Sequence, residues 1–155
     1  MNVEIVDENF HARFSVKAKQ YRYLIDIGEI NIFNNHRAYQ CHYDLDIERM
    51  KEASQLLIGE HDYTSFNTSP LELYPDQVRT IYRIEFVQKG RELEILITGD
   101  GFLRNMVRII VGCLVDIGRG KRDKRELIKM LEEPSKHHRR YNITADGLYL
   151  VEVYY

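Results

Sequence analysis

An arginine inside a strongly apolar stretch is the residue of this sequence that most suggests chemistry. Arg108 lies in FLRNMVRIIVGCLV, residues 102–115. A helix this apolar is mostly buried, and a buried guanidinium is unfavourable unless a carboxylate or phosphate pairs with it. Two interpretations are open. Arg108 extends its charged end to water at a helix edge, or it points at an anionic group in a cleft. No acidic residue near it in the sequence is an obvious partner.

Two further sets of side chains have spacings that suit binding. Arg104 precedes Arg108 by four residues, which predicts that both lie on one helix face and could bind a phosphate together. An exposed arginine beside a buried one fits the same spacing. Tyr21 and Tyr23 project from one side of a predicted strand. Such a pair either packs in a core or stacks on bases from an exposed sheet face, and the spacing does not decide between the two.

Signatures of several other site types are missing from the sequence. The six histidines show no HxxxH or HExxH spacing and there is no CxxC, so no metal site is expected. GxSxG, Walker A and dinucleotide-binding glycine motifs are missing as well. Two distant cysteines, Cys41 and Cys113, favour a reduced, cytoplasmic protein. No run of eighteen apolar residues occurs, so we expect no membrane span.

Charge is unevenly distributed along the chain. The formal net charge is −2, yet residues 101–140 hold eleven Lys and Arg against five Asp and Glu, and residues 1–100 hold eleven against seventeen. A one-sided basic segment suits a surface that faces phosphates. The same run also fits a solvated helical face with a charged loop.

The elements that must position these residues predict an α+β fold. Strands are expected over four stretches, 19–27, 79–88, 92–98 and 147–155. Helices are expected over 47–58, 102–117 and 123–131, with Asp46 and Asp123 as N-caps. The stretches 28–42 and 61–75 are predicted to be mainly loops. The order β-α-β-β-α-(α)-β is the split βαβ, or ferredoxin-like, pattern, with a mostly antiparallel sheet and helices on one face. We expect residues 1–155 to form a single domain.

Four blocks of sequence carry a resemblance to a known family. They are FHARFSVKAKQYRYLI (10–25), GEHDYTSF (59–66), RTIYRI (79–84) with GDGFLRNMVRIIVG (99–112), and DGLYLVEVYY (146–155). In this order and at these distances they resemble the tRNA pseudouridine synthase A family over nearly the whole chain. The resemblance implies the C-terminal domain of an isomerase that converts uridine to pseudouridine in the anticodon stem-loop of tRNA. It also implies a homodimer that uses no cofactor.

The resemblance implies roles for individual residues. Tyr21 is expected to stack on the target base, which must leave the base stack to be reached. Arg108 is expected to pair with the catalytic Asp, and Leu148 to line the base pocket. Three further residues are candidates for contacts near the RNA: Arg104, His11 and Arg13.

The sequence departs from the family pattern at two points. The Arg-Thr-Asp motif that carries the catalytic Asp is missing, since Arg122-Asp123 lacks the Gly-Val that should follow. The stretch YNITADGLYL also lacks the Ala-Pro pair that usually precedes Gly-Leu-Tyr-Leu. We therefore expect a chain without the family's N-terminal domain and without turnover by itself. The alternatives are a non-catalytic RNA-binding or dimerisation module and a ferredoxin-like domain that binds a small molecule.

Overall fold

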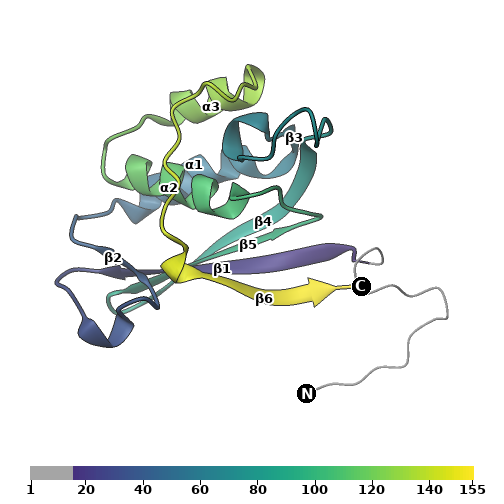
Figure 1. Ribbon diagram of the computed structural model, residues 1–155. Helices are drawn as coiled ribbons and strands as arrows, with labels where there is room; N and C mark the ends of the chain where they lie inside the picture. Colours follow the sequence, from purple (N-terminus) through teal and green to yellow (C-terminus); the bar gives the residue numbers. More distant parts are fainter. Residues whose placement is uncertain (1–15) are drawn as a thin grey trace.

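A six-stranded sheet forms the base of the molecule, which a computed structural model describes for residues 16–155 (Figure 1). The strands are β1 (Ala18–Ile27), β2 (Tyr39–Cys41), β3 (Gly59–Asp62), β4 (Val78–Lys89), β5 (Glu92–Gly99) and β6 (Leu148–Tyr154). Their order is β2-β1-β5-β4-β3, and β6 also pairs with β1. Only the pairing of β1 with β2 is parallel among the described strands. The predicted α+β class is confirmed.

The helices cover one face of this sheet, as the sequence predicts (Figure 1). They are α1 (Ile47–Ser54), α2 (Met106–Gly118) and α3 (Lys124–Glu132). Four short 3-10 turns connect the elements: Ile32–Asn34, Gln55–Leu57, Thr64–Phe66 and Ala145–Gly147. Asp46 caps α1 by accepting from the backbone of Arg49 at 3.1 Å, and Asp123 caps α3 by accepting from that of Arg125 at 2.9 Å. Both predicted caps are confirmed.

The core lies between α2 and the central strands. Alternate residues of β1 and β5 point toward the helices, so Tyr23, Ile25, Ile95 and Ile97 are fully buried. Nearly every residue of α2 is buried against them. Burial of this apolar surface is the main term that stabilises the fold. Among residues 16–155, no helix is long and apolar enough to cross a membrane.

One predicted boundary is wrong, and the difference bears on the site. The helix expected from residue 102 begins only at Met106, because Asn105 has a φ of 60°. A residue in this left-handed conformation cannot lie inside a right-handed helix, so α2 starts after it. Asn adopts this conformation more readily than most residues. Arg104 therefore precedes α2, and the prediction that Arg104 and Arg108 share a helix face is wrong.

Two short strands also lie where loops were predicted. β2 falls within 28–42 and β3 extends into 61–75. Both are short and lie at the two ends of the strand order β2-β1-β5-β4-β3, which explains their weak sequence pattern. The final turn of the helix predicted over 47–58 is a 3-10 turn.

Candidate active site

Residues 139–147, here called the crossing segment, belong to the connection between α3 and β6 and run across α2 (Figure 1). Two glycines let its backbone approach the fold closely. A Cβ on Gly112 of α2 would lie 1.9 Å from the carbonyl oxygen of Tyr141. A Cβ on Gly147 would lie 2.5 Å from the carbonyl oxygen of Leu24 in β1. Side chains at either position would push the crossing segment away.

Hydrogen bonds from two side chains fix this segment. The Tyr23 hydroxyl donates to the carbonyl of Thr144 at 2.6 Å. Arg108 Nε donates to the carbonyl of Ile143 at 2.7 Å. The close backbone packing therefore sets the direction of the Arg108 guanidinium and the position at which β6 begins.

Arg108 is only partly buried and has neutral partners. Besides Ile143, it donates from Nη1 to Oδ1 of Asn105 at 3.2 Å. Within residues 16–155 it takes part in no salt bridge. Its charge is therefore held in a defined direction without a compensating carboxylate from this part of the chain.

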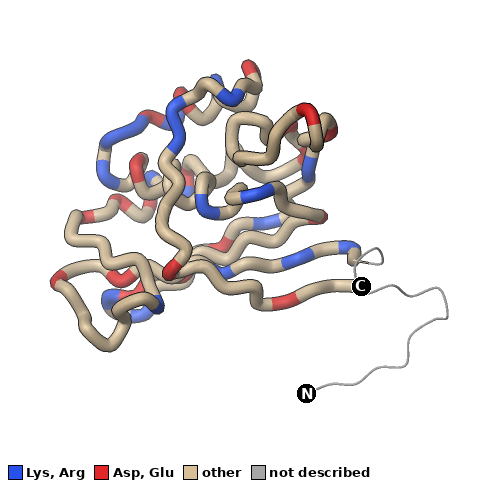
Figure 2. The backbone as a smooth tube through the Cα atoms, in the orientation of Figure 1, with Lys and Arg blue, Asp and Glu red and all other residues tan. Residues whose placement is uncertain are grey.

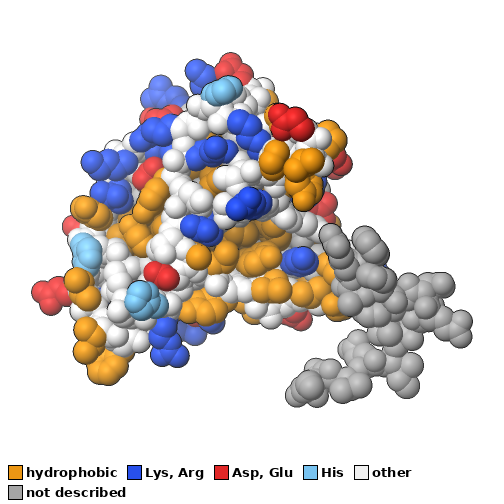
Figure 3. All heavy atoms as spheres, viewed as in Figure 1, with side chains coloured by type: hydrophobic (Ala, Val, Ile, Leu, Met, Phe, Trp, Pro, Cys, Tyr) orange, Lys and Arg blue, Asp and Glu red, His pale blue; other side chains and the backbone are white. Residues whose placement is uncertain are grey.

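A hollow of about 270 Å³ opens beside Arg108, and it is here called the base pocket after the role expected of Leu148. Its lining combines β1, the stretch before α2, the first turn of α2 and the start of β6: Tyr21, Phe102, Leu103, Arg104, Asn105, Met106, Val107, Arg108 and Leu148. Figure 3 shows apolar side chains across this face of the molecule with Lys and Arg above them. The structure thus brings Tyr21, Arg108 and Leu148 together around one space.

Tyr21 and Tyr23 have different surroundings although they share one side of β1. Tyr23 is fully buried and its hydroxyl is bonded to the crossing segment. Tyr21 is partly exposed and meets the Phe102 ring edge-to-face, with 5.1 Å between ring centres and 84° between planes. Burial raises the pKa of Tyr21, so its phenol is protonated at neutral pH. The core interpretation holds for Tyr23, while Tyr21 presents an uncharged aromatic ring to the base pocket.

Asn105 and Phe102 take part in the site although their types alone did not single them out. Asn105 accepts from Arg108 and donates from Nδ2 to Oγ1 of Thr68 at 3.0 Å, so it ties Arg108 to the loop after β3. The Phe102 ring packs closely against β5 at Gly99, where a Cβ would lie only 3.0 Å from the ring. The glycine therefore permits this contact. Asn directly before an apolar run is a general signal of a helix start, but the Asn105 side chain forms no capping hydrogen bond.

Lys and Arg recur along the helical layer and its connecting segments, together with Asp and Glu (Figure 2), and residues 101–140 hold the excess of positive charge. Lys136 donates from Nζ to Oδ1 of Asn67 at 2.7 Å, and Arg140 lies close enough to donate to the carbonyl of the same residue. Burial and the charge of Arg140 lower the pKa of Lys136. The basic segment predicted from the sequence therefore includes cations that hold the loop beside the pocket.

Two predicted RNA contacts, His11 and Arg13, lie outside the described residues. Arg104 is exposed and lines the base pocket from the stretch before α2. A pocket with an aromatic ring, an apolar floor and a directed guanidinium is typical of sites that hold an unstacked base.

Comparisons with known proteins point to the same class of molecule. Residues 53–155 match the family described as tRNA pseudouridine synthase. The tRNA pseudouridine synthase A of Anoxybacillus flavithermus is 47% identical over 150 residues, covering 97% of this chain and 61% of the relative. That of Bacillus licheniformis is 44% identical over 153 residues, covering 98% and 62%, and that of Lactobacillus helveticus is 41% identical over 157 residues, covering 99% and 59%. The chain belongs to the tRNA pseudouridine synthase family, and it spans about three fifths of the length of these relatives.

Proposed function

We propose that this chain forms the C-terminal domain of an isomerase that converts uridine to pseudouridine in the anticodon stem-loop of tRNA. The observation that carries the proposal is the meeting of Tyr21, Arg108 and Leu148 around the base pocket. The family assignment supports the reaction class.

The reaction exchanges one bond of the uracil ring for another. The bond between sugar C1′ and N1 breaks, the ring turns and C1′ bonds to C5. The proton on C5 then leaves and N1 gains a proton, so the composition of the nucleoside is unchanged. In this proposal Tyr21 stacks on the unstacked base, Leu148 packs against its edge, and Arg108 orients the carboxylate that acts at C1′. A preorganised guanidinium suits that role because Ile143 and Asn105 already fix its direction.

We propose that the acting carboxylate comes from residues outside this chain. The two acidic residues worth testing within it already have structural partners. Asp100 Oδ1 accepts from the backbone of Thr80 at 2.8 Å, and Asp123 caps α3. Neither belongs to the lining of the base pocket.

Tritium release from tRNA labelled at uridine C5 tests both parts of the proposal. We expect no release by this chain alone and release by a version extended upstream in the coding sequence, because binding residues cannot replace a missing nucleophile. Release by this chain alone would mean that an Asp within it is catalytic, and Asp100→Asn and Asp123→Asn would then identify it. An extended protein that binds tRNA but releases no tritium would overturn the isomerase assignment.

The second candidate is a non-catalytic RNA-binding or dimerisation module, which the excess of Lys and Arg over residues 101–140 favours. It predicts tRNA affinity that falls steeply with salt and is not accompanied by turnover in the extended protein. A homodimer of the intact protein is part of the main proposal, and the exposed Leu150 and Val151 on β6 offer apolar surface for it. Light scattering across a concentration series tests that point.

Two further points of the proposal concern fold and location. We propose a ferredoxin-like arrangement, supported by β1, β4, β5 and β6, which pair antiparallel and alternate with helices in the split βαβ order. We also propose a cytoplasmic protein, supported by Cys41 and Cys113, which are buried and not bonded to each other.

A further inference from the structure

A second and larger hollow, here called the side pocket, shares a wall with the base pocket. It measures about 420 Å³, within the range of pockets that hold small organic groups. Its lining comes from the loop after β3, the start of β4 and the stretch before α2: Ser69, Pro70, Leu73, Tyr74, Arg79, Phe102, Leu103 and Arg104. The stretch 102–104 borders both pockets. A ligand chain that leaves the base pocket over this stretch therefore meets the side pocket next.

The loop that forms the far wall is fixed by a buried polar cluster. Gln77, almost fully buried, donates to the carbonyls of Ser69 and Tyr74, both at 3.0 Å. Asn67 is fully buried and donates to Gln77 Oε1 at 3.0 Å, and Lys136 donates to both side chains. These bonds order the loop without a ligand, so the side pocket is preformed.

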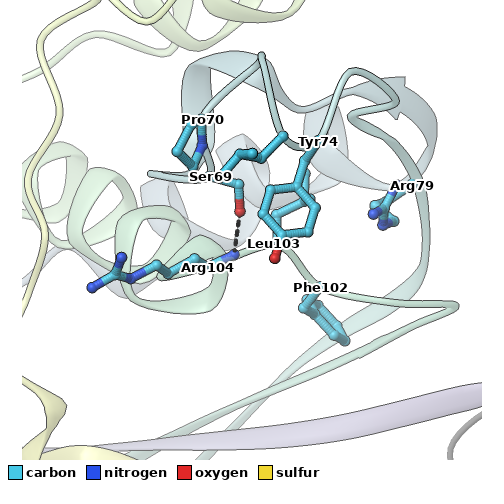
Figure 4. Close-up of a pocket in the computed structure, with 8 residues that line it drawn as sticks. Ser69, Pro70, Tyr74, Arg79, Phe102, Leu103 and Arg104 are labelled. Carbon is cyan, nitrogen blue, oxygen red and sulfur yellow. Dashed lines mark hydrogen bonds between the residues drawn. The ribbon is translucent and has the colours of Figure 1, made fainter.

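The same loop is bonded to the wall that the pockets share. The backbone of Arg104 donates to Ser69 Oγ at 3.1 Å, and the backbone of Thr68 donates to the carbonyl of Arg104 at 3.0 Å (Figure 4). Figure 4 shows the Arg104 guanidinium pointing away from the side pocket, while Tyr74 and Phe102 lie along it. Apart from Ser69 and Arg79, the walls that remain are aromatic and apolar.

Exposed apolar groups and one cation give the side pocket its chemistry. Leu73 is 74% exposed and Tyr74 is 53% exposed, so both offer surface for contact. Arg79 lies along Gly101 and donates from Nη1 to the carbonyls of Asp76 and Val78, at 3.2 Å and 2.7 Å. Within the described residues it joins no salt bridge. An aromatic ring for stacking beside a guanidinium for a phosphate is the combination that binds single-stranded nucleotides.

We propose that the side pocket binds the nucleotide adjacent to the target uridine, with its base on Tyr74 and Leu73 and its phosphate toward Arg79. The inference rests on the proposed function, because the target base must first occupy the base pocket. Moving one base out of the stack frees its neighbour's face. A second stacking site on the shared wall would hold that neighbour and keep the strand open.

Affinity for a fluorescent anticodon stem-loop RNA, measured by anisotropy with this chain, tests the proposal. We expect Tyr74→Ala to weaken binding about ten-fold, the usual size of a lost base–aromatic stack. Tyr74→Phe keeps the ring and should bind like the unmodified chain. Tyr82→Ala is the matched control, since Tyr82 is also 53% exposed but lies on β4 outside the lining of either pocket. Thermal melting of each variant checks that the fold persists.

An RNA with an abasic site beside the target uridine makes the test specific. If the abasic nucleotide is the neighbour that enters the side pocket, removing its base should weaken binding, and so should Tyr74→Ala. The two changes together should weaken binding no more than either change alone, because both remove the same stack. Additive losses with the abasic site on either side of the target would overturn the proposal. So would equal affinities of Tyr74→Ala and Tyr82→Ala.

The same measurements also distinguish the side-pocket proposal from the proposed function on which it rests. Suppose that the unmodified chain binds the RNA and that Tyr21→Ala lowers the affinity while Tyr74→Ala does not. The side-pocket proposal is then overturned, and the role proposed for the base pocket is retained. If the unmodified chain shows no salt-sensitive affinity for the RNA, the side-pocket proposal is overturned, while tritium release by the extended protein still decides the isomerase assignment. Arg79→Gln should lower the slope of log affinity against log salt by about one, because one phosphate contact is lost.

Discussion

Arg108, in the first turn of α2, and Arg122, just after its end, both bond to the crossing segment, but they differ in burial and in the charge of their partners. Arg122 donates to the carbonyl of Arg139 at 2.9 Å, much as Arg108 donates to that of Ile143. Arg122 is only 3% exposed, and carboxylate oxygens of Asp116 and Glu126 lie 3.4 Å from its nitrogens. Arg108 has a backbone carbonyl and an amide oxygen instead. A guanidinium compensated within the chain serves the fold, whereas one held by neutral groups keeps its charge available for a ligand.

Removing the compensated arginine should have the largest effect on folding. We expect Arg122→Met to lower the free energy of unfolding by about 3–5 kcal/mol, because it leaves Asp116 without its buried partner. Urea unfolding followed by circular dichroism measures the change. Adding Asp116→Leu should recover much of the loss, since no uncompensated charge then remains buried. A single substitution with a loss below about 1 kcal/mol would mean that the pair is not a structural requirement.

Removing the uncompensated arginine should affect activity far more than folding. In the upstream-extended protein we expect Arg108→Gln to lower kcat/KM for tRNA about 10²–10³-fold, the usual effect of losing a preorganised electrostatic group. The free energy of unfolding should fall by only about 1 kcal/mol, the value of one hydrogen bond. Arg108→Lys keeps the charge but loses the fork of donors, so it should not restore activity. Equal losses of stability for the Arg108 and Arg122 substitutions would remove the contrast between them.

The close packing between the two arginines gives a third test. Gly112→Ala places a methyl group against the Tyr141 carbonyl and should lower the free energy of unfolding by about 1–3 kcal/mol. Gly101→Ala is the control, because its nearest neighbour would lie at an ordinary 3.5 Å. Calorimetry of both variants measures the difference. If the crossing segment shifts without unfolding, Gly112→Ala should also weaken RNA binding, because Arg108 depends on that segment.

Arg104, an exposed arginine, should show the smallest effect of the three arginines on RNA binding and none on stability. Arg104 borders both pockets and forms no salt bridge within residues 16–155. We expect Arg104→Gln to leave the melting temperature unchanged and to reduce the salt dependence of RNA binding by about one phosphate contact. Arg83→Gln, on the sheet and paired with Glu85, is the control. An unchanged salt slope would place the Arg104 side chain away from the RNA.

Local patterns in the sequence predicted most of the fold. The hairpin of β4 and β5, the caps of α1 and α3 and the burial of α2 follow from alternation, capping residues and apolar periodicity. The start of α2 did not follow, because apolar periodicity continues through Phe102 and Leu103 while the backbone turns at Asn105. Apolar periodicity indicates which residues are buried, but it does not reveal a residue with a left-handed backbone conformation.

The candidate site was predictable only in part for a related reason. Arg108 and Tyr21 stood out from their residue types and neighbours, whereas Leu148 came from the family resemblance. Their meeting depends on strand pairing between β1 and β6 that no local pattern specifies. Arg108 is oriented by a hydrogen bond to a backbone carbonyl. Because every residue carries such a carbonyl, the side-chain sequence does not indicate this bond. The side pocket depends on a buried cluster of Asn67, Gln77 and Lys136, whose members are far apart in the sequence.

The pairing of β1 with β6 also governs when the base pocket can exist during folding. Tyr23 and Thr144 are 121 residues apart, and Leu148 lies opposite Tyr23 in the sheet. Contacts between such distant residues form late and slow the search for the native state. The hairpin of β4 and β5 can form early on a nascent chain, whereas Tyr21 and Leu148 meet only after nearly the whole described chain has been synthesised. A premature stop anywhere before β6 therefore yields a chain with a partial core and no base pocket.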